Sequence, residues 1–231
     1  MQVLQLEQRS PEWYEVRRGR ITMSNAAALL AKGKGVTRAN YLREVAAEIL
    51  GGDVCEDRYQ SIDMLRGAEL EPFAFDALRE KTAINFEQVG FVIASDQRIG
   101  CSPDGLFAGI GCELKCPQVK HHLRYLDKVQ IERDYGAQIQ GSMWVSDCTQ
   151  WVFASFCPDL KEQPLIVHYF ARNVDIIADL SDSALRGADE VEQIVNSCRS
   201  AQTEPKIHAI AENARAFWAQ YQMAFNDEVR L

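Results

Sequence analysis

The feature that most constrains the fold is the stretch of residues 99–117, which predicts two short strands joined by a tight turn. Asp104 lies near the end of the first strand, and Glu113 and Lys115 are two residues apart on the second. Because residues i and i+2 of a strand point to the same face, Glu113 and Lys115 project together while Leu114 turns into the core. The pattern therefore predicts that two carboxylates and an ammonium group meet at one point.

Such a cluster is costly to hold, because like charges repel and each charge loses water. A hard divalent cation bound by Asp104 and Glu113 would offset both costs, since these cations prefer oxygen ligands. Lys115 is then left to hold or activate a water molecule. The stretch thus indicates a metal-dependent hydrolytic site.

The composition is that of a globular α/β protein. The 231 residues are 47% hydrophobic and 25% charged, enough for one well-buried domain or a core with an appended helical region. No apolar run approaches the length of a membrane span, and the first residues lack the basic and apolar segments of a signal peptide. We therefore expect a cytoplasmic protein without membrane contact.

Seven cysteines are odd in number and lack the paired spacing of a disulfide framework or a zinc site. Cys112 and Cys116 flank the candidate strand, which raises the alternative of an iron–sulfur cluster. No C-x2-C run occurs in the sequence, however. Reduced thiols that pack as small hydrophobic groups are the favoured interpretation.

The formal net charge of −8 is the opposite of the basic footprint that nucleic-acid-binding proteins usually show. Its distribution is uneven, because residues 1–43 hold 8 Lys and Arg against 3 Asp and Glu, a local charge of +5. The remaining residues hold 17 and 30, a local charge of −13. This asymmetry indicates a basic face on an acidic body, although a solvated basic helix would give the same counts.

Helix-start signals near the N-terminus gather polar groups. Ser10 and Pro11 predict a helix that carries Arg17, and Ser24 is the expected N-cap of a following helix. Free backbone N–H groups, a serine hydroxyl and Arg17 would form an anion pocket. An ordinary capped helix with a surface arginine fits the same pattern.

Further helices and strands follow. A helical pattern from Ser61 to about Lys81 contains Pro72, which we expect to kink or break the helix. Glu69 and Glu71 lie just before it and are candidates for a third metal ligand, although exposed glutamates fit the same pattern. His121 and His122 are interpreted as surface residues, because hard-cation sites use oxygen. Asp134 is the expected cap of a helix that reaches residue 145.

The final third of the chain completes the predicted architecture. Strand-like runs at residues 150–157 and 165–172 would finish the sheet, and two helices follow from about residue 173. We expect an α/β fold with a mixed central β-sheet flanked by helices. The prediction is a single domain over residues 1–231 with a helical C-terminal region.

Four sequence blocks together resemble the lambda exonuclease (YqaJ-like viral recombinase) family, within the restriction-endonuclease-like PD-(D/E)xK nucleases. They occur in the family's order and cover somewhat over half of the chain. The blocks run from Trp13 to Ser24, from Arg66 to Glu71, from Cys101 to Pro117 with its Pro-Asp and Glu-x-Lys pattern, and from Tyr135 to Trp144. The C-terminal helices carry little of the motif.

This resemblance implies a restriction-endonuclease-like core and a Mg²⁺ site, in which Mn²⁺ can substitute. By the resemblance, Asp104 and Glu113 bind the metal, the carbonyl of Leu114 and the carboxylate of Glu71 complete the site, and Lys115 orients or activates the attacking water.

The resemblance also implies how DNA is held. A pocket for the terminal 5′-phosphate would be formed by Arg17, Ser24, Ser102 and Gln138. Met64 falls where the family places an apolar wedge that splits the terminal base pair, and Lys34 falls in a basic loop that reaches toward the duplex.

The activity implied is Mg²⁺-dependent, processive 5′-to-3′ degradation of double-stranded DNA, with release of 5′-mononucleotides, for phage-type single-strand annealing recombination. The implied partners are 5′-phosphorylated duplex ends, two further copies in a homotrimeric ring, and a single-strand annealing protein. A ring would also resolve the charge problem, because three basic faces can line one channel. An endonuclease of the same fold and a non-catalytic DNA-end-binding scaffold are the alternatives.

Overall fold

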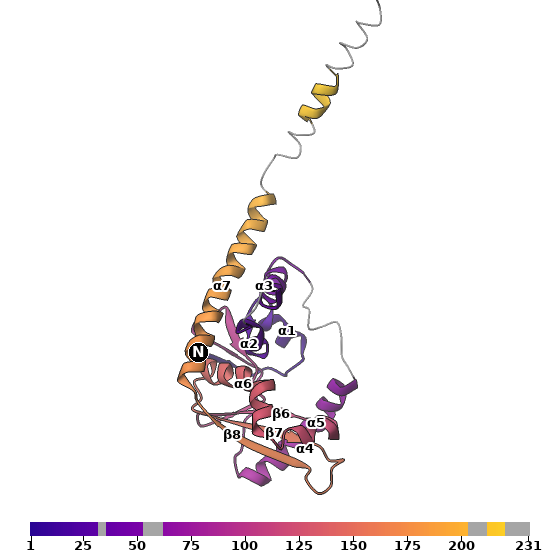
Figure 1. Cartoon of the computed structure of the whole chain (residues 1–231), viewed down its shortest axis with the longest axis vertical. Helices are drawn as coiled ribbons and strands as arrows, with labels where there is room; N and C mark the ends of the chain where they lie inside the picture. Colours follow the sequence, from indigo (N-terminus) through magenta and orange to yellow (C-terminus); the bar gives the residue numbers. More distant parts are fainter. Residues whose placement is uncertain (32–35, 53–61, 203–211, 220–231) are drawn as a thin grey trace, which may run out of the picture. The chain divides into compact units, whose positions relative to one another are not determined.

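The computed structural model describes residues 1–31, 36–52, 62–202 and 212–219. The chain divides into two compact units, Met1–Glu192 and Gln193–Leu231. In chain order the elements are β1 (Gln2–Leu4), α1 (Pro11–Arg17), β2 (Ile21–Thr22), the 3-10 turn η1 (Met23–Asn25), α2 (Ala26–Leu29), α3 (Val36–Ile49), α4 (Ile62–Thr82), β3 (Phe91–Ile93), β4 (Ile99–Cys101), β5 (Gly105–Phe107), β6 (Ile110–Lys115), α5 (Val119–Arg124), α6 (Lys128–Val145), β7 (Gln150–Phe156), β8 (Leu165–Ala171) and α7 (Val174–Gln202) (Figure 1). The second unit holds the end of α7 and a helical stretch at residues 212–219.

Within the described residues the strands form two four-stranded sheets, in the orders β1-β3-β4-β2 and β5-β6-β7-β8. Each is mixed, because β2 pairs with β4 and β6 pairs with β7 in parallel while the other pairs are antiparallel. The predicted α/β class with helices flanking mixed strands is confirmed. The chain leaves the first sheet after β4 and enters the second sheet at β5.

Strand β7 lies inside the second sheet and is buried on both faces. Trp151 and Phe153 pack into the hydrophobic cluster that includes residues of α6, and Val152 and Ala154 pack into the cluster that includes residues of α4. Alternate residues of a strand point to opposite faces, so α6 and α4 cover the two sides (Figure 1). Gly111 of β6 is required here, because a Cβ would overlap the Trp151 ring.

The predicted start of α1 is confirmed. Ser10 is the N-cap, its hydroxyl accepts a hydrogen bond from the backbone N–H of Trp13 at 3.2 Å, and Pro11 is the first helical residue. Ser24, in contrast, lies inside the 3-10 turn η1 and does not cap α2, whose N-cap is Asn25. The prediction for the Ser24 cap is therefore wrong, because the tighter turn moves the helix start by one residue.

One further helix prediction is corrected, and of the two effects predicted for Pro72 the structure excludes a break. Helix α6 begins at Lys128 with Asp127 as its N-cap, so Asp134 lies inside the helix, where it pairs with Arg124 at 3.1 Å. Helix α4 continues past Pro72 to Thr82 and is not broken there. A proline removes one helical hydrogen bond, which the packing of α4 against the second sheet can offset.

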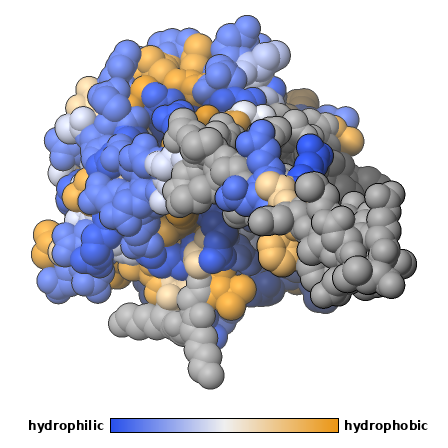
Figure 2. Space-filling model, turned by 90° about the horizontal axis from the view of Figure 1, so that it is seen from above, coloured by the Kyte–Doolittle hydropathy of each residue, from blue (hydrophilic) through white to orange (hydrophobic). Residues whose placement is uncertain are grey.

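The surface in Figure 2 is mainly hydrophilic, with apolar side chains in scattered groups. Among the described helices, none combines the length and apolar character that a membrane crossing would need.

Candidate active site

The hairpin of β5 and β6 holds Asp104 against the second strand. Gly105 pairs with Cys112, so the ladder begins one residue after Asp104. The carboxylate of Asp104 accepts a hydrogen bond from the backbone N–H of Leu114 at 2.6 Å. Gly109 in the turn has a φ of +81°, which suits a residue without a Cβ. The short hairpin thus fixes the carboxylate beside the middle of β6.

Glu113 and Lys115 project from the same face of β6, as the sequence predicts, and Leu114 is buried on the other face. The Lys115 Nζ lies 2.6 Å from the Glu113 Oε1, and the amide of Gln138 on α6 donates to the same oxygen at 2.9 Å. The Glu113 side chain is only 4% exposed, whereas that of Lys115 is 32% exposed. Glu113 is therefore held in place, and part of the Lys115 side chain reaches solvent.

The charged groups of this cluster shift one another's pKa values. Burial raises the pKa of the Asp104 carboxyl, and the neighbouring Glu113 carboxylate raises it further. Burial acts to lower the pKa of Lys115, but Glu113 and Asp104 outweigh it and raise that pKa above its ordinary value. The ammonium is therefore charged at neutral pH beside the carboxyl groups of Glu113 and Asp104.

The donor set fits a hard divalent cation. In the described part of the chain, no three His, Cys, Asp or Glu side chains converge as they would around a metal ion. Mg²⁺, however, needs only one or two protein carboxylates and keeps several waters. Asp104 and Glu113 offer such a pair, and a bound cation would offset the cost of burying a charged Asp104 next to Glu113.

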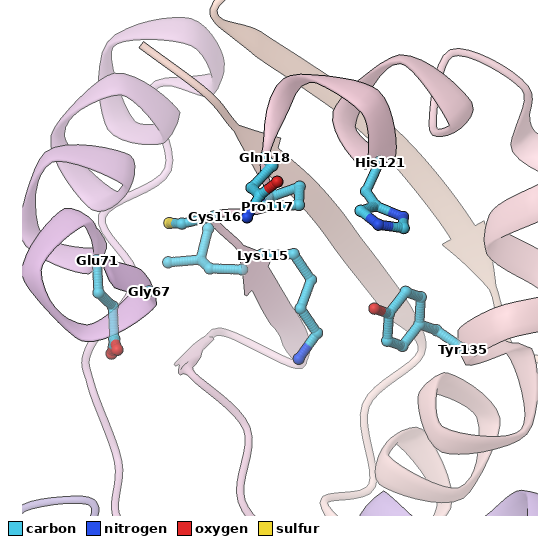
Figure 3. A pocket seen from close by; sticks show the side chains of 9 residues that line it. Gly67, Glu71, Lys115, Cys116, Pro117, Gln118, His121 and Tyr135 are labelled. Carbon is cyan, nitrogen blue, oxygen red and sulfur yellow. The ribbon is translucent and has the colours of Figure 1, made fainter. Parts of the chain in front are cut away.

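Glu71 lies on α4 between two cavities at this site. The first, of about 370 Å³, is lined by Glu71, Leu114, Lys115 and Tyr135 among others. Figure 3 shows the side chains of Glu71, Lys115 and Tyr135 around it. The second, of about 250 Å³, is lined by Glu71 and Asp104. Glu71 thus borders the same cavity as Asp104, although within the described residues it forms no cluster of three metal-ligating side chains with the hairpin.

Arg17 is buried beside two of the predicted phosphate ligands. Its guanidinium, 6% exposed as a residue, donates to the hydroxyl of Ser102 at 3.0 Å and to that of Ser24 at 3.4 Å. It also lies 4.1 Å from the centroid of the Trp13 ring. A planar cation flanked by hydroxyl groups is suited to bind phosphate oxygens. The structure therefore brings Ser102 to Arg17 and Ser24, which lie far from it in the sequence.

Gln138 is placed with the carboxylates, because its amide bonds to Glu113. The buried Cys101, at the end of β4, is influenced by both groups of residues, the one around Glu113 and the one around Arg17. Burial is the main cause of the raised pKa of its thiol, and Glu113 raises while Arg17 lowers this pKa. The carboxylate cluster and the arginine cluster therefore both act on the end of β4.

Two predicted DNA contacts cannot be placed. Lys34 lies outside the described residues, and Met64 lies in α4 with a side chain outside the description. Their roles stay predictions.

The prediction that His122 is a surface residue is wrong. Its ring is fully buried, with Nδ1 2.7 Å from the Ser155 Oγ and Nε2 2.9 Å from the carbonyl oxygen of Gln163. Because a carbonyl only accepts, Nε2 carries the proton and Ser155 donates to Nδ1. Ser155 pairs with Lys115 in the β6–β7 ladder, so His122 anchors α5 beside the site.

Sequence reasoning also missed Arg9 and the bracing role of Arg66. The Arg66 guanidinium donates to the carbonyl oxygens of Cys116 and Pro117 at 2.7 and 2.9 Å and pairs with Asp159 at 2.8 Å. It therefore ties α4 to the segment that follows Lys115. The arginine's place in a family block was the available signal, but the block does not reveal its partners.

Comparisons with known proteins agree with this arrangement. The family model described as the YqaJ-like viral recombinase domain matches residues 12–149. A crystal structure of an alkaline exonuclease (LHK-Exo) from Laribacter hongkongensis is 24% identical, with a TM-score of 0.76 over 84% of this chain and 98% of that chain. A second crystal structure, of LHK-Exo in complex with dAMP, has a TM-score of 0.77, with 24% identity over 84% of this chain and 100% of that chain.

A phage related exonuclease from Haemophilus somnus 129PT is 15% identical, with a TM-score of 0.65 over 80% of this chain and 99% of that chain. A search of curated protein sequences finds no match. The structural likenesses establish the fold, and the family model covers more than half of the sequence. The predicted family resemblance is confirmed, and the chain belongs to the YqaJ-like viral recombinase family.

Proposed function

We propose that this protein is a Mg²⁺-dependent exonuclease that degrades the 5′ strand of double-stranded DNA processively. It releases 5′-mononucleotides and leaves a 3′ single strand for annealing recombination. The observation that carries the proposal is the placement of Asp104, Glu113 and Lys115 on one hairpin, with the buried Arg17 cluster at the end of the preceding strand. The likeness to two proteins named exonucleases, one of them in complex with a nucleoside monophosphate, supports it.

Asp104 and Glu113 would hold the metal ion, with the carbonyl of Leu114 and the carboxylate of Glu71 as further oxygen ligands. Mn²⁺, with similar ligand preferences, is expected to substitute. A divalent ion held there would supply stabilisation of negative charge on the scissile phosphate and a lower pKa for coordinated water.

Lys115 orients the attacking water and supports negative charge at the phosphate. Its ammonium is held by Glu113, and Tyr135 lies below it with the ring centroid 5.3 Å from Nζ. Gln138 fixes the Glu113 carboxylate from α6, so the lysine and the glutamate keep one geometry. A site fixed in this way needs little rearrangement during reaction.

The cluster of Arg17, Ser24 and Ser102 would determine which end of a DNA strand is degraded. Arg17, Ser24 and Ser102 would bind the terminal 5′-phosphate, with Gln138 as a fourth ligand, and only a 5′ end that carries a phosphate would fill such a pocket. Lys34 and Met64 are proposed to contact the duplex and to part its last base pair.

The proposed assembly is a homotrimeric ring around the duplex that passes the surviving strand to an annealing protein. Each copy contributes one exonuclease domain with its helical C-terminal region. A ring allows the basic N-terminal region to line a channel while the body stays acidic.

Digestion of linear duplex DNA labelled at either end tests the proposal. The duplex is used with and without a 5′-phosphate, in Mg²⁺ and in EDTA, beside closed circles. We expect Mg²⁺-dependent release of mononucleotides from the phosphorylated 5′ strand and intact circles. Cutting of circles would indicate an endonuclease, and binding without hydrolysis would indicate a scaffold.

Arg17→Ala is expected to lose the preference for phosphorylated ends. Removal of a charged hydrogen-bond donor should slow initiation on a 5′-phosphate about tenfold, with little change on a 5′-hydroxyl end. The ratio of the two rates is measured for each variant, so a partly folded sample does not change it. Arg18→Ala is the matched control, because Arg18 pairs with the exposed Glu15. An unchanged ratio in Arg17→Ala would contradict the phosphate pocket.

A further inference from the structure

The segment before α1 forms one wall of the 250 Å³ cavity that contains Asp104. Arg9 of this segment and Glu71 of α4 line the cavity, and Arg9 Nη2 lies 3.2 Å from Glu71 Oε2. The Arg9 side chain is 45% exposed and that of Glu71 is 21% exposed. A solvent-accessible cation therefore sits on one of the carboxylates beside the proposed metal site.

The backbone at Arg9 is held on both sides. The preceding residue, Gln8, donates from its side-chain amide to the carbonyl oxygens of Val89 and Pro103, each at 3.0 Å, and Pro103 directly precedes Asp104. The following residue, Ser10, caps α1. Arg9 itself has a φ of +69°, in the left-handed region that favours glycine. The backbone of Arg9 is thus fixed relative to Asp104, whereas its long side chain can move.

The Arg9 guanidinium can pair with either of two anions, the Glu71 carboxylate or a phosphodiester of DNA. In the DNA-free protein it occupies Glu71 and so competes with a divalent cation for that carboxylate. A cation held by the carboxylates would draw Glu71 away from Arg9, and a phosphodiester entering the cavity would offer two oxygens to the guanidinium. Arginine binds such a pair of oxygens through two parallel hydrogen bonds.

We infer that Arg9 is a phosphate-binding residue of the active site that exchanges between Glu71 and the DNA backbone. The inference rests on the function proposed above. It predicts effects of opposite sign, because loss of Arg9 frees Glu71 for the metal and removes a contact to DNA. A residue that only braced α4 would change both in the same direction or neither.

Arg9→Gly is the variant of choice, since glycine accepts the positive φ and the fold keeps its backbone. Arg79→Ala is the matched control, because it removes one positive charge from an exposed pair with Asp76 on the same helix as Glu71. Mn²⁺ affinity is measured without DNA by electron paramagnetic resonance. Duplex affinity is measured in EDTA by fluorescence anisotropy, so neither readout depends on turnover.

For Arg9→Gly we expect Mn²⁺ to bind about threefold more tightly and duplex DNA about tenfold more weakly, with the control unchanged. In Mg²⁺ the KM for DNA should rise while kcat stays close to that of the unmodified protein. Weaker metal binding, or unchanged DNA binding, would overturn the role of Arg9. Absence of hydrolysis by the unmodified protein would instead overturn the proposed function, and the two binding titrations still decide the question for Arg9.

Discussion

Lys115→Ala is expected to lower turnover by about a thousandfold while duplex binding changes by about twofold or less. The ammonium is placed 2.6 Å from Glu113, where it can orient a water but contributes little to holding a long duplex. Single-turnover digestion of a 5′-phosphorylated duplex in Mg²⁺ gives the chemical rate, and anisotropy in EDTA gives the affinity.

Lys120→Ala, an exposed lysine on α5, controls for the loss of one positive charge near the site. It should digest DNA at the rate of the unmodified protein. Hydrolysis by Lys115→Ala at that same rate would remove Lys115 from the mechanism, and equal loss of binding and turnover would assign it to DNA binding.

Asp104→Asn is expected to abolish metal-dependent hydrolysis and yet to stabilise the metal-free protein. The asparagine oxygen can still accept from the backbone N–H of Leu114, which Asp104 accepts at 2.6 Å. The substitution also removes the negative charge of Asp104, which burial and Glu113 disfavour. The free energy of unfolding in EDTA should rise by about 1–2 kcal/mol at neutral pH, and the activity should fall by about a thousandfold.

The pH dependence of this difference has a defined sign. The pKa of Asp104 is raised in the folded protein, so the folded state holds the proton more tightly than the unfolded state. The wild-type protein therefore loses stability relative to Asp104→Asn as the pH rises above about 4, where an unfolded aspartate ionises. The loss continues until the pH passes the folded pKa.

Thermal unfolding of both proteins in EDTA at several pH values measures this difference, which should vanish under acidic conditions. Mg²⁺ should raise the unfolding temperature of the wild-type protein and leave that of Asp104→Asn unchanged. A variant less stable than the wild-type protein at neutral pH would contradict the unfavourable charge at Asp104.

The sequence predicted the hairpin site because its geometry is local. The spacing of Glu113 and Lys115 places both on one face of a strand whatever surrounds it, and the Ala108 and Gly109 turn brings Asp104 back to the same strand. Strand β7 was predictable for a similar reason, since an apolar run bounded by polar turns fits a buried strand.

Contacts between distant segments were not predictable in this way. His122 is buried because Ser155 of β7 and the carbonyl of Gln163 meet its two nitrogens, and nothing next to it in the sequence indicates either partner. The weak signal was its spacing of three residues from the buried Tyr125, which places both on one side of a helical turn. Arg9 had no sequence signal, because its pair with Glu71 depends on how α4 packs.

The pairing of β6 with β7 sets the smallest piece of this chain that could fold around the site. The family model ends at residue 149, one residue before β7 begins, and starts at residue 12, after Gln8 and Arg9. A fragment cut at these limits would lack β7, which contains Trp151 and Ser155. The edge of β6 that pairs with β7 would then be unpaired, and the surface of Gly111 that the Trp151 ring covers would be exposed. The region recognisable by common ancestry is therefore shorter than the region that must fold together.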